Sequence, residues 1–295
     1  MSKQTSVTVL GVRVDILTMD QATKNIIGWI KSGSGRPRTV VKPYVEFMVP
    51  SGVRVDAQAK SALASADMSV ADGVSLQWGA SFLYGAPHTK PTLFKLVCSA
   101  LVWIQQPAWR RQILPERFAG IDFTIRILDN ALNHGWKVGV IGGSPDTART
   151  QLALQERWPD LQLANVWSGY TRTTSNMDYD GADSDPGFMA ILEEIRQQHL
   201  DVLFVAMGYP RQEIFMEKYR DSLGAKVLIG EGGSFDYKEL GGTVARSPRI
   251  VRTLHLEWFW RLLRQPSRIG RQLAVPRYTW SVFREARRVW LREKS

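Results

Sequence analysis

The sequence predicts an α/β fold, a doubly wound, mostly parallel, Rossmann-like sheet followed by a basic helical C-terminal appendage. Short runs of Val, Leu, Ile and Phe, such as Asp201–Met207 and Lys226–Ile229, have the pattern of strands buried on both faces. These runs alternate with helical patterns as far as Ser234. Basic residues are concentrated in the last fifty positions, so the appendage differs from the rest of the chain.

The N-terminal third contains the first elements of this fold. Val7–Ile16 alternates apolar and polar residues, which predicts a strand pair. Thr18 is expected to cap a helix that runs to about Lys31. Thr39–Met48 is expected to be a strand that bends or ends at Pro43, because proline lacks the backbone N–H group.

Asp72 is the first candidate site residue. A helix over Asp56–Ser65 leads into a short strand that ends at Ala71-Asp72-Gly73, before a further helix. An Asp at that position can simply cap the following helix. Its place at the carboxyl end of a strand, where α/β folds bind ligands, is what makes it a candidate.

The segment Gly85–Gln112 is apolar, contains Trp and ends in a small basic cluster. One interpretation is a helix buried in the core. The other is an element at a membrane interface, where aromatic side chains flanked by Arg are common. Both interpretations stay open from the sequence.

The middle of the chain continues the alternation. A helix over Asp122–Asn133 precedes a strand at Lys137–Ile141, and Gly142 and Gly143 then turn the chain into a helix that ends near Trp158. Such a turn can hold a phosphate with backbone N–H groups, although it does not match the dinucleotide motif GxGxxG.

Between a strand at Leu161–Val166 and a helix at Phe188–Gln198 lies a long polar loop. Its Asp178 and Asp180 form a DxD pattern, the metal-binding motif of many sugar transferases. A surface loop is the preferred interpretation, because the loop is so rich in Asp, Ser and Gly that the pattern arises easily by chance.

Two turns near the C-terminal end of the sheet form the strongest candidate site. After the strand at Asp201–Met207, Gly208 allows a sharp turn and Pro210 is expected to open a helix that reaches about Leu223. The strand at Lys226–Ile229 ends in the glycine-rich turn GEGGSFD. Either turn alone could be an ordinary surface loop. Together they bring four polar residues to one sheet edge: Arg211, Gln212, Glu213 and Asp236.

Composition and charge limit the classes of protein. The chain has 295 residues and one cysteine, Cys98, so internal disulfides and cysteine zinc sites are excluded and a reducing cytoplasm is expected. Its longest uncharged apolar run, Leu96–Ile104, is shorter than the ~20 residues that span a bilayer. We therefore expect a protein that is soluble or bound to a surface.

The net charge of +10 lies entirely in the last fifty residues. Residues 246–295 carry thirteen basic and three acidic side chains, whereas residues 1–245 carry 25 of each. We therefore predict a neutral domain over 1–245 and a basic appendage over 246–295. Helices are expected at Leu254–Gln265 and Tyr278–Arg292, and their arginines and tryptophans suit an anionic membrane or nucleic acid.

Several motifs together resemble the WecG/TagA/CpsF family of bacterial glycosyltransferases. The matching stretches are ADG at Ala71–Gly73, ERFAG at Glu116–Gly120, IGGSP at Ile141–Pro145, MGYPRQE at Met207–Glu213, GEGGSFD at Gly230–Asp236 and the tail ARSPRIVRTLHLEWFWRLLRQPSRIGRQ. The resemblance covers nearly the whole chain, and GYPRQE and EWFWRLLRQPSR are its most specific parts.

The resemblance implies an activity and partners. It implies transfer of a sugar from a UDP-sugar to a polyprenyl-diphosphate-linked sugar acceptor, with inversion and without a metal, by a protein that is peripheral on the cytoplasmic face of the membrane. Asp72 matches the proposed general base, and Arg117 a catalytic position. Gln212 and Asp236, like Arg117, match positions that line the donor site. Gly142, Gly143 and Glu213 are expected to bind the donor as well. The residues expected to contact the acceptor and the membrane are Arg249, Arg252, Arg261, Arg264 and Arg268. The resemblance implies no further cofactor. Association of several copies of the chain into a homo-oligomer is an additional expectation.

The chain departs from the family where the family has a Thr-Pro-Asn-like triplet. Here the residues are Lys42-Pro43-Tyr44, so the roles of that Thr and Asn cannot be transferred to Lys42 and Tyr44. Three hypotheses follow. The first is an active inverting glycosyltransferase with no nucleic acid partner. The second is a catalytically weakened relative that binds nucleotide-sugar or lipid and assists another transferase. The third is a nucleic-acid-binding protein.

Overall fold

The computed structural model describes residues 5–33, 35–49, 57–85, 90–143, 146–169, 182–248, 251, 257–264 and 273–294. Within these ranges the side chains of 100–105, 107, 110, 257, 258 and 261 are not described. The first element is an antiparallel hairpin, β1 (Ser6–Val9) and β2 (Val12–Asp15), as the alternating pattern predicts. The main sheet follows it in the chain.

Six parallel strands form the main sheet in the order β4-β3-β8-β7-β5-β6. Their bounds are β3 (Arg38–Val41), β4 (Met68–Ser69), β5 (Lys137–Gly142), β6 (Gln162–Trp167), β7 (Val202–Ala206) and β8 (Val227–Gly230). Every residue of β7 and β8 is buried, which explains why their sequences are continuous apolar runs. The predicted α/β fold class with a parallel Rossmann-like sheet is confirmed.

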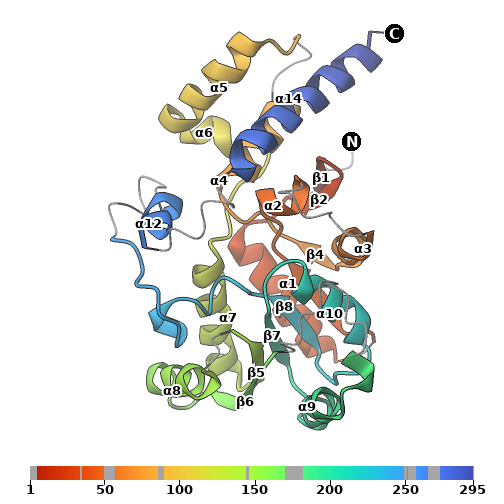
Figure 1. Ribbon diagram of the computed structural model, residues 1–295, viewed down its shortest axis with the longest axis vertical. Helices are drawn as coiled ribbons and strands as arrows, with labels where there is room; N and C mark the ends of the chain where they lie inside the picture. The colour runs from red at the N-terminus through yellow and green to blue at the C-terminus, as the bar shows by residue number, and fades with distance from the viewer. Residues whose placement is uncertain are drawn as a thin grey trace.

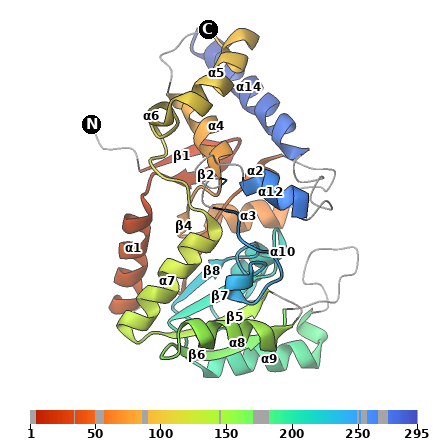
Figure 2. The same ribbon diagram turned by 90° about the vertical axis from the view of Figure 1, so that its left-hand side faces the viewer.

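Helices cover both faces of the sheet (Figure 2). One face carries α1 (Met19–Ser32), α7 (Gly120–His134) and α8 (Thr147–Arg157), and the other carries α3 (Ala57–Ser65), α9 (Pro186–Gln197) and α10 (Arg211–Tyr219). Alternate residues of a strand point to opposite faces. Accordingly Val202 and Phe204 pack in the first core cluster, while Leu203 and Val205 pack in the second. We call the sheet and these six helices the body.

A third core cluster lies beside the body and is built from elements far apart in the sequence. It joins the hairpin, α4 (Val74–Tyr84) and α14 (Ala274–Arg292). Tyr278 of α14 is fully buried, and its ring occupies the space that a side chain at Gly79 of α4 would need. The C-terminal helix is therefore packed into the fold through one face.

Two short helices complete this part of the molecule, α5 (Leu93–Gln105) and α6 (Pro107–Arg110). We call α4, α5, α6 and α14 the cap; Figure 1 shows it above the body, with α5 and α14 at the end of the molecule farthest from β6. The remaining elements are α2 (Val45–Met48), the 3-10 turns η1 (Ala182–Ser184) and η2 (Lys238–Leu240), and α12 (Glu257–Arg264). Among the described helices, none is both long enough and apolar enough to cross a membrane.

Three predicted elements differ from the structure in their bounds. The strand expected over Thr39–Met48 ends at Val41, next to Pro43, which is one of the two predicted outcomes because Pro43 cannot donate to a sheet ladder; residues 45–48 instead form α2. Helix α10 begins after Pro210 and ends at Tyr219, where the backbone N–H and Oγ of Ser222 both bond to the Tyr219 carbonyl.

The last helix begins at Ala274, four residues before the predicted start at Tyr278. Pro276 lies in its first turn, where the missing N–H group would have no helical partner in any case. The predicted helix start at Leu254 falls outside the described residues, as does most of the polar loop. The division at residue 245 stays a prediction, although α14 itself contributes to the core.

Candidate active site at the carboxyl edge of the sheet

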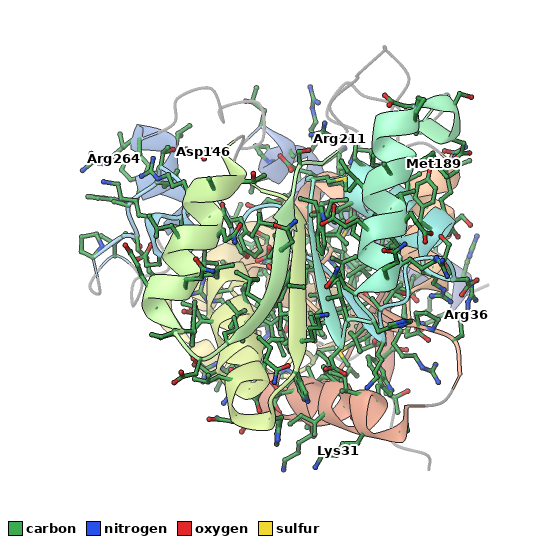
Figure 3. All side chains as sticks on the ribbon, turned by 90° about the horizontal axis from the view of Figure 1, so that it is seen from below. Lys31, Arg36, Asp146, Met189, Arg211 and Arg264 are labelled. Atoms are coloured by element: carbon green, nitrogen blue, oxygen red, sulfur yellow. The ribbon has the colours of Figure 1, made fainter. Side chains whose placement is uncertain are left out.

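The carboxyl ends of the parallel strands meet at one edge of the sheet. Figure 3 shows Asp146 and Arg211, at the starts of α8 and α10, at this edge, and Lys31, at the end of α1, at the opposite edge. Strands β3, β8, β7 and β5 are neighbours in that order, so the turns that follow them are adjacent in space. The prediction that these two strands end at one edge of the sheet is confirmed, because β7 and β8 are parallel neighbours.

Asp72 and Arg117 lie beside each other above β4. The N–H of Asp72 donates to the Pro43 carbonyl at 3.2 Å, and the N–H of Phe118 donates to the Ala71 carbonyl at 2.8 Å. These two bonds fix the backbone of Asp72 against the turn after β3 and against the residue that follows Arg117. Both side chains are partly exposed, so they are accessible to a ligand.

Tyr44 covers the other side of the Asp72 turn. Gly73 has a φ of +84°, a region that favours glycine, and the Tyr44 ring lies 3.0 Å from where a Cβ on Gly73 would be. The aromatic ring therefore packs directly on the residue that follows the candidate base. In this chain Tyr44 helps to shape the approach to Asp72.

A pocket of about 220 Å³ opens next to Arg117. It lies where the cap meets the body, and its lining residues are Met19, Gln77, Arg111, Glu116, Arg117, Ala119 and Asp122. Glu116 is engaged structurally, because its Oε2 accepts the N–H of Met19 at 2.7 Å at the start of α1. Asp122 bonds to Arg246, the first arginine of the basic tail. Two arginines on the pocket wall make it suited to a ligand with negative charge.

Gln212 connects the turn after β7 to the turn after β8. Its Oε1 accepts the N–H groups of Gly208 at 3.2 Å and of Gly232 at 2.9 Å. Gly232 is so close to Gly208 that a Cβ would lie 2.6 Å from the Gly208 backbone. The side chain predicted to bind the donor is thus already the link that holds two candidate donor turns together.

Glu213 is buried beneath these turns rather than exposed at the edge. Its Oε1 accepts the Gln212 Nε2 at 2.8 Å, while its Oε2 has no hydrogen-bond partner among the described residues. Burial raises the pKa of Glu213 to about 7, partly offset by the hydrogen bond from Gln212. A carboxyl group in that state holds its proton close to neutral pH.

Lys42 is directed into the protein interior at the end of β3. Its Nζ forms a buried ion pair with Glu231, the first residue after β8, and the Ser234 hydroxyl bonds to the same carboxylate oxygen. At the start of α7, Gly120 leaves room for the group, since a Cβ there would lie 2.8 Å from the Ser234 Oγ and 3.1 Å from the Lys42 Nζ. Lys42 therefore joins β3, β8 and α7 below the site.

The turn after β5 approaches β7 closely. Gly142 and Gly143 both have a φ of +88°, and the N–H of Gly143 donates to the Ala206 carbonyl at 2.7 Å. The N-terminus of α8 is capped by Asp146, whose Oδ1 accepts the N–H of Arg149 at 3.0 Å. The Arg149 N–H, in the first turn of α8, is therefore already bonded to the Asp146 carboxylate.

The remaining predicted residues are less completely described. Asp236 is partly buried, and its carbonyl accepts the N–H of Val244 at 2.9 Å. In α12 the guanidinium of Arg264 lies 5.1 Å from the centre of the Trp260 ring. The side chain of Arg261 is not described, and Arg249, Arg252, Arg268, Asp178 and Asp180 lie outside the described residues.

Sequence reasoning missed the buried group that supports the site. Glu231 and Ser234 are both in the quoted motif GEGGSFD, but the motif does not reveal that Glu231 pairs with Lys42 and accepts the Ser234 hydroxyl. It also missed Gln77 and Arg111 as pocket residues, because they come from α4 and from the segment after α6. The one signal was that Arg111 precedes the ERFAG motif by a few residues.

Comparisons with known proteins bear on the identity of this chain. The model of the Glycosyl transferase WecG/TagA/CpsF family matches residues 7–111 and 99–292. A curated relative is the N-acetylglucosaminyldiphosphoundecaprenol N-acetyl-beta-D-mannosaminyltransferase of Bacillus spizizenii (strain ATCC 23059 / NRRL B-14472 / W23). It is 33% identical over 175 residues, which cover 59% of this chain and 62% of the relative, so the match spans about three fifths of either protein. Because the family model matches nearly the whole chain, the chain belongs to the WecG/TagA/CpsF family of glycosyl transferases.

Proposed function

We propose that this protein is an inverting glycosyltransferase that moves a sugar from a UDP-sugar to a polyprenyl-diphosphate-linked saccharide. The observation that carries the proposal is the backbone hydrogen bond from the Phe118 N–H to the Ala71 carbonyl, which holds the Asp72 turn beside Arg117. Arg117 in turn lines a pocket at the carboxyl edge of the sheet. Membership of a glycosyl transferase family supports the reaction class. The lipid-linked acceptor rests on the name of the Bacillus relative.

In the proposed reaction Asp72 is the general base. A hydroxyl group of the acceptor attacks the anomeric carbon, the bond from that carbon to UDP breaks, and the hydroxyl proton moves to the Asp72 carboxylate. A single displacement of this kind inverts the anomeric centre. Arg117 offsets the negative charge that develops on the departing diphosphate, the usual role of a guanidinium beside a leaving phosphate.

The donor is assigned to the turns after β5, β7 and β8. Gly142 and Gly143 bring backbone close to the end of β7, and Asp236 follows the glycine-rich turn after β8. Gln212 and Glu213 serve this site by fixing the two turns on which the donor would rest. Their contribution to donor affinity is therefore expected to be indirect.

The acceptor is assigned to the pocket and the basic tail. Arg111 and Arg117 line the pocket, and Arg246 contacts its rim residue Asp122. The tail arginines are proposed to meet the acceptor diphosphate and the anionic inner face of the cell membrane, so the protein would be peripheral there. No metal is proposed for the reaction, and EDTA is therefore expected to leave turnover unchanged.

A second candidate function follows from Lys42 and Tyr44. Lys42 is buried in an ion pair, and Tyr44 packs on Gly73 next to the candidate base. A site altered in this way could bind a nucleotide-sugar or a lipid-linked sugar without transferring it at a useful rate. In that case the protein would assist another transferase.

One experiment separates the two functions. The full chain is incubated with phosphatidylglycerol vesicles, a polyprenyl-diphosphate-linked N-acetylglucosamine and each of a set of UDP-sugars, and the release of UDP and the lipid product are measured. Thermal unfolding with each UDP-sugar identifies the donor that binds, because a ligand of the folded state raises the apparent stability. Turnover with the stabilising donor supports the transferase. Stabilisation without turnover supports the second candidate.

A further inference from the structure

The first two turns of α5 expose large apolar side chains to solvent. Leu93, Phe94 and Val97 are 59%, 76% and 62% exposed. At 100° per residue they fall within one arc of about 100° on the helix. Three large apolar residues grouped on one helix face differ from the scattered single residues that are normal on a protein surface. We call these three residues the α5 tip.

The opposite face of α5 is fixed to the protein. Ser99 is buried; its Oγ accepts the Trp78 Nε1 of α4 at 3.2 Å and donates to the Leu96 carbonyl at 2.7 Å. Trp78 in turn stacks on Phe82 and meets the edge of Tyr278 from α14. The α5 tip is therefore held outward by a packed support.

The electrostatic character of this region is basic. From Gly73 to Pro115 the sequence contains no Asp or Glu, while it contains Lys90, Lys95, Arg110 and Arg111. The ammonium group of Lys90 lies 5.9 Å from the centre of the Trp290 ring, so the start of α5 adjoins the end of α14.

Helix α14 adds a second face with the same character. Its exposed side carries Arg284, Arg287, Arg288 and Arg292 together with the exposed Trp280 and Leu291. Both views of the molecule place α5 and the C-terminal half of α14 at the same end, remote from β5 and β6 (Figures 1 and 2).

We propose that the α5 tip inserts into an anionic lipid bilayer, with the basic residues of α5 and α14 on the headgroups around it. Apolar side chains flanked by Lys and Arg are what an interfacial helix presents to lipid. A second copy of the chain fits less well, because two such basic faces would repel each other. Nucleic acid fits less well too, since its phosphates gain nothing from Leu93, Phe94 and Val97.

The chain leaving α6 leads directly to the pocket, which it lines with Arg111 and Arg117. Insertion of the α5 tip would therefore set the depth of the pocket relative to the headgroups. This inference deepens the proposed function, which needs a lipid-linked acceptor. Vesicle binding requires no sugar transfer, however, so the failure of one does not imply the failure of the other.

The first test compares two double variants of the full chain. Phe94→Ser/Val97→Ser removes apolar surface from the α5 tip, whereas Leu152→Ser/Met189→Ser removes side chains that are 56% and 41% exposed on α8 and α9 of the body. Binding to phosphatidylglycerol vesicles is measured by sedimentation at increasing salt. We expect the tip variant to bind at least about tenfold more weakly at every salt concentration, since apolar burial is not screened. The body variant should bind as the unmodified chain does.

The second test uses the single cysteine of the chain. Cys98 is replaced by Ser, and a nitroxide label is attached at Val97→Cys or, as the control, at Leu152→Cys. Bilayer depth is read from the label's accessibility to oxygen and to a water-soluble relaxation agent. Insertion is supported if, on vesicle-bound protein, the label at 97 is shielded from the water-soluble agent and the label at 152 is not.

Three results would overturn the proposal. One is equal vesicle binding by the tip and body variants. Another is a label at 97 that stays in water on bound protein. The third is a lipid-free dimer, seen by sedimentation velocity, that the tip variant abolishes, because the α5 tip would then be an interface between two copies.

Discussion

The body and the cap differ in where charged side chains are paired and in how exposed apolar side chains are grouped. In the body, charged side chains near the sheet form buried or partly buried ion pairs, such as Lys42 with Glu231 and Arg220 with Asp67. In the cap, three large apolar residues are exposed together on α5 near exposed arginines, whereas exposed apolar residues of the body, such as Leu152 and Met189, lie on separate helices. Neither folding nor solubility requires a surface that combines exposed arginines with a group of exposed apolar side chains.

This difference indicates that the body and the cap have separate roles, and the pocket lies where the two parts meet. The body fixes the geometry of Asp72, Arg117 and the donor turns through backbone bonds and buried pairs. The cap offers a surface suited to a charged interface, and it contributes Gln77 and the adjoining Arg111 to the pocket wall. Substitutions in the body should therefore change chemistry or stability, and substitutions in the cap should change membrane binding.

The largest expected effect belongs to Asp72→Asn in the body. Removing a general base lowers turnover by about 10²–10⁴-fold. UDP affinity by calorimetry should be unchanged, because Asn keeps the shape of the side chain. Asp160→Asn, an exposed residue of the body, is the matched control. Full turnover in the Asp72 variant would place the base elsewhere.

The second prediction tests the buried pair below the site. Lys42→Thr restores a residue type of the family but leaves Glu231 buried without its partner, which should cost about 3–5 kcal/mol of unfolding free energy. Midpoints of urea unfolding check this value. The double variant Lys42→Met/Glu231→Gln should recover part of the loss, because it leaves no unpaired charge. A loss below about 1 kcal/mol in the single variant would mean that the pair does not support the fold.

The sequence predicts the fold class and most elements well, for a physical reason. Strands buried on both faces, such as β7, are recognisable by composition alone, and Thr18 with Gln21 forms the capping box that starts α1. The direction in which a polar side chain points is set by tertiary contacts. Nothing local shows that Lys42 turns inward or that Glu213 is buried. The site was therefore predictable as a set of turns, whereas the roles of its residues required the structure.

The third prediction concerns the cap and its exposed arginines. Replacing Arg284, Arg287, Arg288 and Arg292 by Gln should weaken binding to phosphatidylglycerol vesicles, by at most about 1 kcal/mol for each residue. The loss should shrink as salt rises, since headgroup attraction is screened within about one Debye length.

The matched control removes four exposed arginines of the body, Arg36, Arg149, Arg157 and Arg196. Both variants lower the net charge by the same amount, so only location differs between them. Equal loss of vesicle binding in the two variants would show that net charge, and not the cap, drives association.

The smallest expected effect is a pH dependence of the unfolding free energy that arises from Glu213 in the body. Its folded pKa of about 7 exceeds the ordinary 4.5 because the carboxyl group is buried. Between these pH values the folded protein binds a proton that the unfolded chain has released. Its unfolding free energy should therefore fall as the pH rises from about 4.5 to about 7, by up to about 3 kcal/mol.

Glu213→Gln removes this titration and keeps an oxygen that can accept the Gln212 Nε2. We expect the variant to be more stable than the unmodified chain at pH 8 and to differ little from it at pH 4.5. Urea unfolding across this range checks the sign, with the exposed Glu156→Gln as a control. A variant that is destabilised equally at both pH values would mean that the Glu213 carboxyl makes contacts that an amide cannot replace. Because the folded carboxyl group is neutral at pH 4.5 and charged at pH 8, an equal loss would assign these contacts to its hydrogen-bond geometry and not to its charge.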